Sequence, residues 1–302
     1  MTNNKLNSHK VAVVGAGTMG NGIAHVFAQY GYPVTMIDIS PDALQRGLDT
    51  ISKNLDRMVQ KDKITADEKN QAIGLLKTSS DISSAVSDAT LIIEAATENV
   101  DLKLKLFRDF NQYSQKDAIL ATNTSSISIT KIGSVTDRPE QVIGMHFMNP
   151  VPVMKLVEII RGFSTSDDVT KEVMSIAQSL GKTPVTVNDY PGFIANRILI
   201  PMINEAIISL WEGVAGVREI DSVMKLGMAH PMGPLQLADF IGLDVVLAIL
   251  RVLQDGYGQP KYAPCPLLVN MVQAGKLGVK SGEGFYTYVG GSNEPEVSKA
   301  FK

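Results

Sequence analysis

Most of the first two thirds of the chain alternates short apolar runs, rich in Val and Ile, with longer amphipathic stretches. This alternation is typical of a mostly parallel, doubly wound α/β sheet that is covered by helices. The pattern predicts strands at residues 11–14, 34–37, 91–93, 118–121, 142–145, 156–160 and 184–187. It predicts helices at residues 19–30, 41–60, 66–75, 102–113, 126–132 and 167–180.

The pattern changes after Asp189-Tyr190-Pro191-Gly192, where strand signals become rare. Helices are predicted at residues 193–210, 217–225, 234–240 and 244–253. We therefore expect an α/β domain over residues 1–188 and a smaller all-α domain over residues 189–302. The polar ends of the chain, residues 1–9 and 290–302, are predicted to be flexible.

A glycine-rich turn, Gly15-Ala16-Gly17-Thr18-Met19-Gly20, follows the first predicted strand. In a strand–turn–helix setting, the first glycine permits the tight turn and the second lets the backbone approach a pyrophosphate. The third lets helix and strand pack closely, and the helix N-terminus offers N–H groups to the phosphates. Asp38 ends the next apolar run, 18 residues after Gly20, near the position of an acid that binds the adenosine ribose. The first domain is therefore predicted to be Rossmann-type and to bind NAD, because Asp38 would repel the 2′-phosphate of NADP.

Composition excludes several other classes of protein. The chain has 302 residues, 44% of them apolar, which is enough for two domains with cores of their own. Its 28 basic and 31 acidic residues give no reason to expect nucleic acid or an anionic membrane as a partner. The single cysteine, Cys265, excludes a disulfide framework and a cysteine metal cluster, and we predict no metal site. The polar start lacks a signal-peptide region, and no run reaches the ~18 apolar residues of a membrane span, so we expect a cytoplasmic protein.

An NAD enzyme that moves hydride needs a proton acceptor near the reacting carbon, and the chain has four histidines. His9 lies in the polar start, His25 lies in the helix after the glycine turn, and His230 precedes a proline; we interpret these as structural or solvent-facing. His146 ends a buried-type strand, where ligands bind in such sheets. Its position is equally compatible with a catalytic base and with a hydrogen-bonded core histidine.

Three polar features are candidates to complete a site around His146. Glu158 interrupts the apolar run Leu156-Val157-Glu158-Ile159-Ile160. A buried strand should not carry an unpaired acid, so Glu158 either partners a histidine or faces outward on an edge strand. The segment Asn123-Thr124-Ser125-Ser126 follows a strand and could hold a substrate oxygen or cap the next helix. Asn196 opens the first helix of the second domain and could face a cleft or solvent.

Together these segments resemble the 3-hydroxyacyl-CoA dehydrogenase family, particularly its bacterial 3-hydroxybutyryl-CoA branch. The resemblance runs in the family order over roughly residues 10–288. Its motifs are Gly15-Ala16-Gly17-Thr18-Met19-Gly20, Asn123-Thr124-Ser125-Ser126, His146-Phe147-Met148-Asn149-Pro150, Asp189-Tyr190-Pro191-Gly192-Phe193-Ile194-Ala195-Asn196-Arg197 and Pro231-Met232-Gly233-Pro234.

The resemblance implies a role for each matching residue. His146 would be the general base and Glu158 its partner, while Ser125 and Asn196 would hold the reacting oxygen and the thioester end of the substrate. NAD would be bound by the glycine turn, including Thr18 and Met19, and by Asp38, Ser125, Glu98, Lys103, Asn149 and Lys280. The helix at 41–60 corresponds to the coenzyme A contact region, where Asn54 and Lys61 match in position. Asn54 stands where some relatives have serine, and Lys61 could instead be an ordinary exposed lysine.

The resemblance implies an NAD-dependent dehydrogenase of short-chain (S)-3-hydroxyacyl-CoA thioesters, such as 3-hydroxybutyryl-CoA, which interconverts them with 3-ketoacyl-CoA. A gulonate-type sugar-acid dehydrogenase is the nearest alternative and would need no coenzyme A site. Enzymes of the phosphogluconate or hydroxyisobutyrate type use a catalytic lysine, which the His146 and Glu158 pattern disfavours. A non-catalytic NAD-binding protein is the alternative from another class. The apolar stripe from Ile194 to Leu210 predicts a homodimer through the second domain, unless the stripe is wholly internal core.

Overall fold

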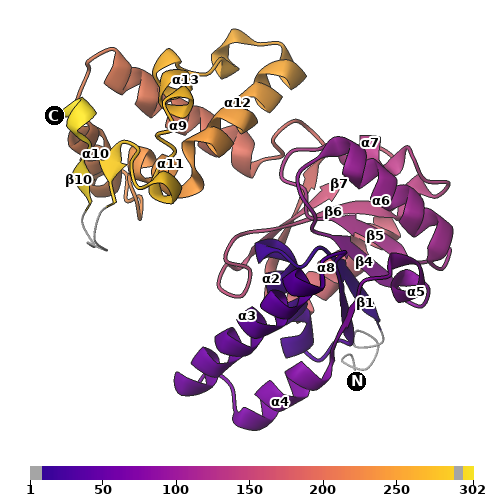
Figure 1. Ribbon diagram of the computed structural model, residues 1–302. Helices are drawn as coiled ribbons and strands as arrows, with labels where there is room; N and C mark the ends of the chain where they lie inside the picture. The colour runs from indigo at the N-terminus through magenta and orange to yellow at the C-terminus, as the bar shows by residue number, and fades with distance from the viewer. Residues whose placement is uncertain (1–8, 289–294) are drawn as a thin grey trace. The chain divides into compact units, whose positions relative to one another are not determined.

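The computed structural model describes residues 9–288 and 295–302 and divides into two compact units. The first unit ends at Tyr190 and the second begins at Pro191, two residues beyond the boundary predicted after residue 188. Figure 1 colours the first unit from indigo to pink and the second from orange to yellow.

The first unit is built on one eight-stranded sheet with the order β3-β2-β1-β4-β5-β6-β7-β8. Neighbouring strands run parallel, except β6 and β7, which are antiparallel. This order confirms the predicted doubly wound, Rossmann-type sheet. The strands are β1 (Val11–Val14), β2 (Val34–Ile37), β3 (Leu76–Ser79), β4 (Leu91–Glu94), β5 (Ile119–Thr122), β6 (Val142–Phe147), β7 (Leu156–Arg161) and β8 (Thr183–Asn188).

Helices cover both faces of this sheet. They are α2 (Thr18–Gln29), α3 (Pro41–Gln60), α4 (Ala66–Gly74), α5 (Ile82–Val86), α6 (Val100–Tyr113), α7 (Ile129–Gly133) and α8 (Asp167–Ser179). Residues of α2, α3 and α8 share one apolar core with alternate strand residues such as Val11 and Val13. Ala12, between them on β1, is equally buried, as expected where helices cover both faces.

One strand and one α-helix of the first unit were not predicted, and one helix starts later than predicted. Strand β3 lies at the sheet edge and exposes Lys77 and Thr78, so no apolar run marks it. The short helix α5 was missed as well. Helix α7 begins at Ile129 rather than at residue 126, because the Ser128 side chain caps it by accepting from Lys131 N at 3.1 Å.

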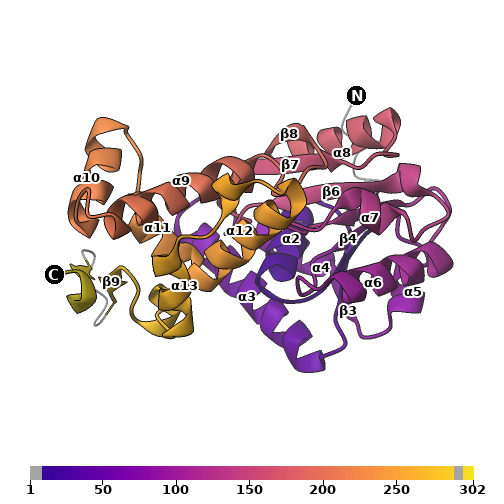
Figure 2. The ribbon, with the colours of Figure 1, turned by 90° about the horizontal axis from the view of Figure 1, so that it is seen from above.

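The second unit is mostly helical. Its helices are α9 (Ala195–Trp211), α10 (Val217–Gly227), α11 (Pro234–Ile241), α12 (Leu243–Tyr257) and α13 (Pro266–Gln273). Figure 2 shows α9, α11, α12 and α13 grouped together, and they share one apolar core. Arg197, near the start of α9, places its guanidinium 4.0 Å from the ring centroid of Tyr257. None of the helices in the described parts of the chain is long and apolar enough to cross a membrane.

The C-terminal tail differs from the flexible, all-α end that the sequence pattern predicts. Strands β9 (Tyr286–Thr287) and β10 (Glu296–Val297) form a small antiparallel sheet. Ser298 is fully buried, and the rings of Phe301 and Phe285 lie 5.7 Å apart. Residues 295–302 are therefore part of the folded second unit. His9, at the other end, lies 3.0 Å from the Thr90 hydroxyl through Nδ1, whereas residues 1–8 and 289–294 fall outside the described residues.

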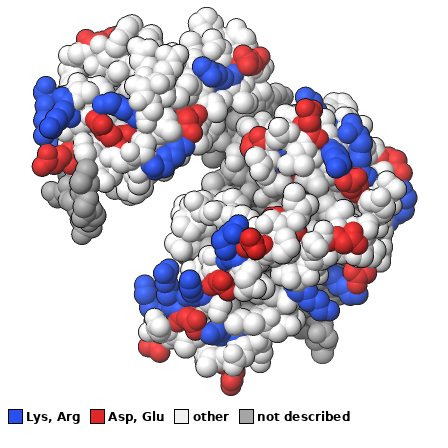
Figure 3. Space-filling view, in the orientation of Figure 1, with Lys and Arg blue, Asp and Glu red and all other residues white. Residues whose placement is uncertain are grey.

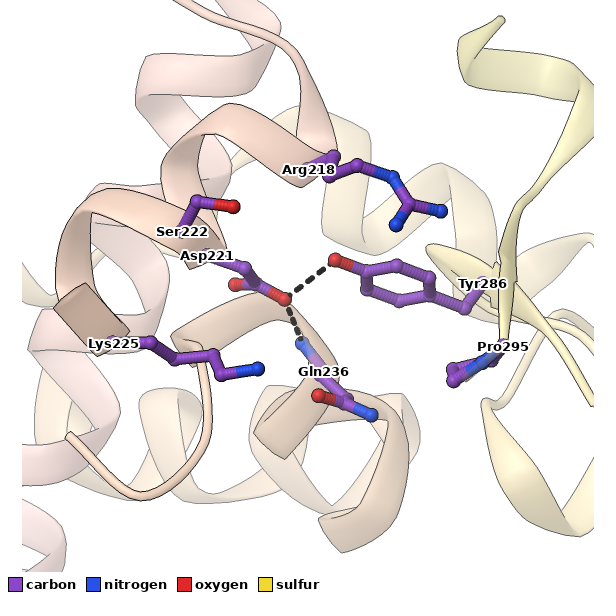
Figure 4. Close-up of a pocket in the computed structure, with 7 residues that line it drawn as sticks. All are labelled: Arg218, Asp221, Ser222, Lys225, Gln236, Tyr286 and Pro295. Carbon is purple, nitrogen blue, oxygen red and sulfur yellow. Dashed lines mark hydrogen bonds between the residues drawn. The ribbon is translucent and has the colours of Figure 1, made fainter. Parts of the chain in front are cut away.

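Two buried carboxylates join α10 and α11 to β9. Asp221 accepts hydrogen bonds from the Gln236 amide at 3.0 Å and from the Tyr286 hydroxyl at 2.8 Å (Figure 4). Asp239 accepts from the Tyr286 amide at 2.9 Å and from the Tyr288 hydroxyl at 3.0 Å. Burial raises the pKa of Asp221, and it raises the pKa of Asp239 to about 6.

Candidate active site

The glycine turn between β1 and α2 has the shape needed to hold a pyrophosphate. Gly15 has φ +108°, and a Cβ at this position would lie 2.6 Å from the Ala95 carbonyl oxygen. A Cβ at Gly20 would lie 1.7 Å from the Gly15 carbonyl oxygen, so the close packing of turn and helix requires glycine. A Cβ at Gly17 would meet no atom within 4 Å, and no side chain caps α2 there. This open, uncapped helix N-terminus fits a phosphate-bearing ligand.

Asp38 follows β2 and lies beside the glycine turn. Its Oδ2 accepts a hydrogen bond from Ala16 N at 2.8 Å, and its Oδ1 accepts one from Ser40 N at 3.0 Å. Both bonds fix the carboxylate at the carboxyl edge of β1 and β2, where the ribose of a dinucleotide binds in such sheets. Together with the turn, Asp38 makes this edge fit a dinucleotide.

His146 and Glu158 are cross-strand partners on the antiparallel strands β6 and β7. Nδ1 of His146 lies 2.8 Å from Oε2 of Glu158, and the two side chains are 9% and 1% exposed. Strand β8 covers the other side of β7, so the outward-facing interpretation of Glu158 is wrong. Because an ionised carboxylate can only accept, the contact assigns the proton of a neutral imidazole to Nδ1 and leaves Nε2 as an acceptor.

Ser125 lies on the loop after β5, and its Oγ is 3.1 Å from Nε2 of His146. The Asn123 side chain accepts a hydrogen bond from Phe147 N at 2.8 Å, which ties the end of β5 to the end of β6. Three of the four residues predicted to be catalytic therefore meet at one edge of the sheet. The loop does not cap α7 as the alternative interpretation held, since Ser128 does so.

Glu98 joins the loop after β4 to the loop that carries Ser125. Its Oε1 accepts from the Ser125 amide at 2.9 Å, from the Ser126 amide at 3.2 Å and from the Thr124 hydroxyl at 2.5 Å. Its Oε2 lies 3.3 Å from the Lys103 ammonium. Burial acts to raise the pKa of Glu98, but the Lys103 charge and these hydrogen bonds hold it below its ordinary value.

Lys103 lies inside the wall of this site, although the family resemblance implies a cofactor contact. Its side chain is 1% exposed, and its ammonium lies between Glu94, at 2.6 Å, and Glu98. Glu98 is the more accessible partner, with a side chain 40% exposed. The Lys103 ammonium thus contacts both carboxylates from a buried position.

The other predicted site residues lie on both units. Asn149 is exposed just after β6. Asn54 is half-buried on α3, and the exposed Lys61 follows seven residues later, on the same side of the helix. In the second unit, Asn196 is the second residue of α9, and Lys280 pairs with Asp244.

Sequence reasoning missed Glu94, which ends the buried run Leu91-Ile92-Ile93-Glu94 and is itself fully buried. The signal was present, because an acid that closes a buried strand needs a partner just as Glu158 does. The predicted strand ends at residue 93, one residue before this acid.

The fold and the site define an oxidoreductase class: a dinucleotide-binding sheet with a buried imidazole–carboxylate pair at its ligand-binding edge. The chain belongs to the 3-hydroxyacyl-CoA dehydrogenase family. Residues 10–190 match the model of the family's NAD binding domain, and residues 192–288 match that of its C-terminal domain. NAD is therefore the cofactor of the first unit.

Named relatives agree with this family. The chain is 52% identical over 279 residues to a probable 3-hydroxybutyryl-CoA dehydrogenase of Bacillus subtilis, covering 92% of this chain and 97% of the relative. It is 50% identical over 286 residues to a 3-hydroxybutyryl-CoA dehydrogenase of Bradyrhizobium diazoefficiens, covering 95% and 97%. The crystal structure of (S)-3-hydroxybutyryl-CoA dehydrogenase PaaH1 from Ralstonia eutropha is similar, with 50% identity, a TM-score of 0.91 and coverage of 93% and 99%.

Proposed function

We propose that this protein transfers hydride between NAD and C3 of short-chain (S)-3-hydroxyacyl-CoA thioesters, with His146 as the proton acceptor and donor. The observation that carries the proposal is the chain of contacts from Glu158 through His146 to Ser125 at the dinucleotide-binding edge of the sheet. The names of the relatives supply the substrate class, 3-hydroxybutyryl-CoA and its 3-keto partner.

The residues of the site act on the proton. When bound, NAD accepts hydride from the substrate carbon or returns it in the reduced form. Nε2 of His146 accepts the proton of the 3-hydroxyl group, and in the reverse direction the imidazolium donates it. The Glu158 carboxylate holds Nδ1–H and stabilises the imidazolium that forms, which is the role that a carboxylate plays beside a catalytic histidine. A base positioned in this way contributes ~10²–10⁴-fold to the rate.

Ser125 and Asn196 hold the substrate. The Ser125 hydroxyl, beside Nε2, donates a hydrogen bond to the reacting oxygen, and the Asn196 amide binds the thioester end. Glu98, Asn149 and Lys280 contact NAD, while Lys103 keeps Glu98 in place. Asp38 binds the ribose hydroxyls and selects NAD over NADP, since its carboxylate would repel a 2′-phosphate.

The coenzyme A part of the substrate binds along α3. Figure 3 shows basic side chains gathered over the far end of this helix. Arg46, Lys53 and Arg57 are exposed on α3 at spacings of seven and four residues, and Lys61 continues the same face. This row of cations suits the phosphates of coenzyme A, with Asn54 beside it.

The test of the function is a steady-state comparison of substrates. We expect NADH-dependent reduction of acetoacetyl-CoA, a lower kcat/KM with longer 3-ketoacyl-CoA thioesters, and little activity with NADPH. Oxidation of gulonate in preference to 3-hydroxybutyryl-CoA would instead place the protein with the sugar-acid dehydrogenases. Absence of turnover with intact NADH binding would indicate a non-catalytic protein.

A second copy of the chain is the partner we propose for the second unit, giving a homodimer. A groove of about 430 Å³ between α9 and α10 is lined mainly by apolar side chains such as Met202, Ala206 and Val223. Val214, which lines the groove, is 73% exposed, and Trp211 on α9 and Leu226 on α10 are 56% and 86% exposed. An apolar surface of this kind on a folded protein usually marks an interface.

Sedimentation equilibrium tests the dimer. We expect a dimer at micromolar concentration and a monomer when Val223 is replaced, as Val223→Asp. Phe163→Asp is the matched control, because Phe163 is 93% exposed on the first unit and should leave the dimer intact. A wild-type monomer would contradict the proposal.

We also propose that the protein works in the cytoplasm. Its single cysteine suits a reducing compartment, since disulfides belong to oxidising ones. Cell fractionation with antibody detection tests this, and recovery in a secreted or membrane fraction would contradict it.

A further inference from the structure

The fully buried carboxylate of Glu94 is a junction of hydrogen bonds behind the proposed active site. Its Oε1 accepts from the Lys103 ammonium and from Ala96 N, both at 2.6 Å. Its Oε2 accepts from Lys103 at 2.8 Å and from the Thr122 hydroxyl at 2.6 Å. These partners come from three different segments, namely α6, the loop after β4 and the end of β5.

One line of contacts leads from Glu94 to the serine loop through two charges. Lys103 bridges the Glu94 carboxylate and Oε2 of Glu98, the latter at 3.3 Å. The other oxygen of Glu98 holds the Ser125 amide at 2.9 Å and the Ser126 amide at 3.2 Å. Glu98 lies on a loop and its side chain is partly exposed, so packing alone leaves the carboxylate free to rotate. The ion pair with the buried Lys103 ammonium restricts its orientation.

A second line is shorter and uncharged beyond Glu94 itself. The Thr122 hydroxyl donates its hydrogen to Glu94, so the hydroxyl oxygen can accept a hydrogen bond from the following loop. Thr124 N donates to that hydroxyl at 3.2 Å. Both lines therefore end on residues 124–126, the segment that carries Ser125.

Burial of these charges is hard to explain by stability alone. Replacing a buried ion pair with apolar residues is often neutral or stabilising, whereas a buried pair can fix one geometry. The Glu94 network fixes the loop whose Ser125 hydroxyl lies 3.1 Å from His146.

We propose that Glu94 is a positioning residue, which sets Ser125 against His146 through Lys103–Glu98 and through Thr122. Its kinetic consequence rests on the function proposed above.

Glu94→Gln tests this with little change of volume. The amide loses the negative charge that pairs with the Lys103 ammonium and offers one acceptor oxygen where the carboxylate offers two, so the hold of residue 94 on Lys103 is weakened in either orientation of the amide. We expect kcat for acetoacetyl-CoA reduction to fall roughly 10- to 100-fold, the range for a misplaced reacting group. Thr122→Val should lower kcat in the same direction, and Thr122→Ser, which restores the hydroxyl, should recover it.

A double-mutant cycle separates positioning from general damage. If Glu94 acts through Ser125, Glu94→Gln should change kcat at saturating NADH by less than about twofold in a Ser125→Ala background, since the group being positioned is gone. Equal losses in the two backgrounds would overturn the proposal. Arg138→Met is the control, because Arg138 is a buried cation that holds Ser114 and the end of α6. It should lower thermal stability without lowering kcat of the folded enzyme.

A spectroscopic comparison keeps the test independent of turnover. The ¹⁵N signal of His146 Nε2 should move in Glu94→Gln toward its position in Ser125→Ala. An unmoved Nε2 signal in Glu94→Gln, with a shift in Ser125→Ala, would refute the positioning role. A wild-type protein that is inactive on acetoacetyl-CoA would refute the proposed function, and the Nε2 signals would still decide the role of Glu94.

Discussion

Nδ1 of His146 lies 2.8 Å from Oε2 of Glu158, directly across the antiparallel pair β6 and β7. This pair is the one antiparallel step in the eight-stranded sheet. An antiparallel register places two side chains opposite each other on one face, with Cβ atoms roughly 5 Å apart. The departure from parallel order is thus what brings acid and base together.

Replacing the proposed base should abolish turnover without removing the cofactor. For His146→Gln we expect kcat to fall by ~10²–10⁴-fold, the usual contribution of a positioned base. NADH binding, measured by fluorescence, should be retained because the glycine turn is untouched. His230→Gln is the matched control, and normal turnover of His146→Gln would remove the assigned base.

Replacing Glu158 should be nearly as costly as replacing the histidine. Glu158→Gln keeps a hydrogen-bonding group beside Nδ1 but loses the charge that stabilises the imidazolium, so we expect a loss of roughly 10²- to 10⁴-fold in kcat. Glu172→Gln, at a side chain 48% exposed on α8, should retain full activity. A Glu158→Gln enzyme with wild-type kcat would show that the charge has no catalytic role.

Asp38 should control the choice between NADH and NADPH. In Asp38→Ala the repulsion of the 2′-phosphate is gone, and so is the acceptor for the ribose hydroxyls. We expect the ratio of kcat/KM for NADH to that for NADPH to fall by about tenfold or more, because close like charges cost several kcal/mol. The measurement is the ratio of kcat/KM for the two cofactors in the wild type and in Asp38→Ala. A wild-type preference for NADPH would contradict the role assigned to Asp38.

Asp239 should make stability depend on pH. Burial raises its pKa to about 6, from an ordinary value of 3.8, so the folded state binds this proton more tightly than the unfolded state. The resulting stability is fully present below about pH 4 and is lost as pH rises through about 6, with a total of roughly 2–3 kcal/mol.

The comparison with Asp239→Asn isolates this carboxyl from the others. We expect the unfolding free energy of the wild type, minus that of Asp239→Asn, to be larger near pH 4.5 than near pH 7.5, as the linkage sign requires. Denaturant titrations at several pH values measure it. A difference that stays constant with pH would show that Asp239 does not titrate in this range.

The features that depend on local pattern could be predicted from the amino-acid sequence alone. The alternation of apolar runs and amphipathic stretches predicted the doubly wound sheet, and the spacing of Gly15, Gly17, Gly20 and Asp38 predicted a dinucleotide site. Both predictions are confirmed because strand burial, helix periodicity and a tight glycine turn are properties of a few neighbouring residues. Strand β3 and the C-terminal sheet were missed because their stability comes from pairing with distant segments.

The way in which the charged residues act together depends on contacts between segments that are far apart in the chain. His146 and Glu158 come from two strands and Ser125 comes from the loop after a third, and the sequence left each of them with two interpretations. The resemblance implies that Lys103 and Glu98 contact the cofactor, and the structure adds that the buried Lys103 ammonium lies between the Glu94 and Glu98 carboxylates. The physical reason is that the partner of a buried charge is fixed by strand order and register, which join residues far apart in the chain.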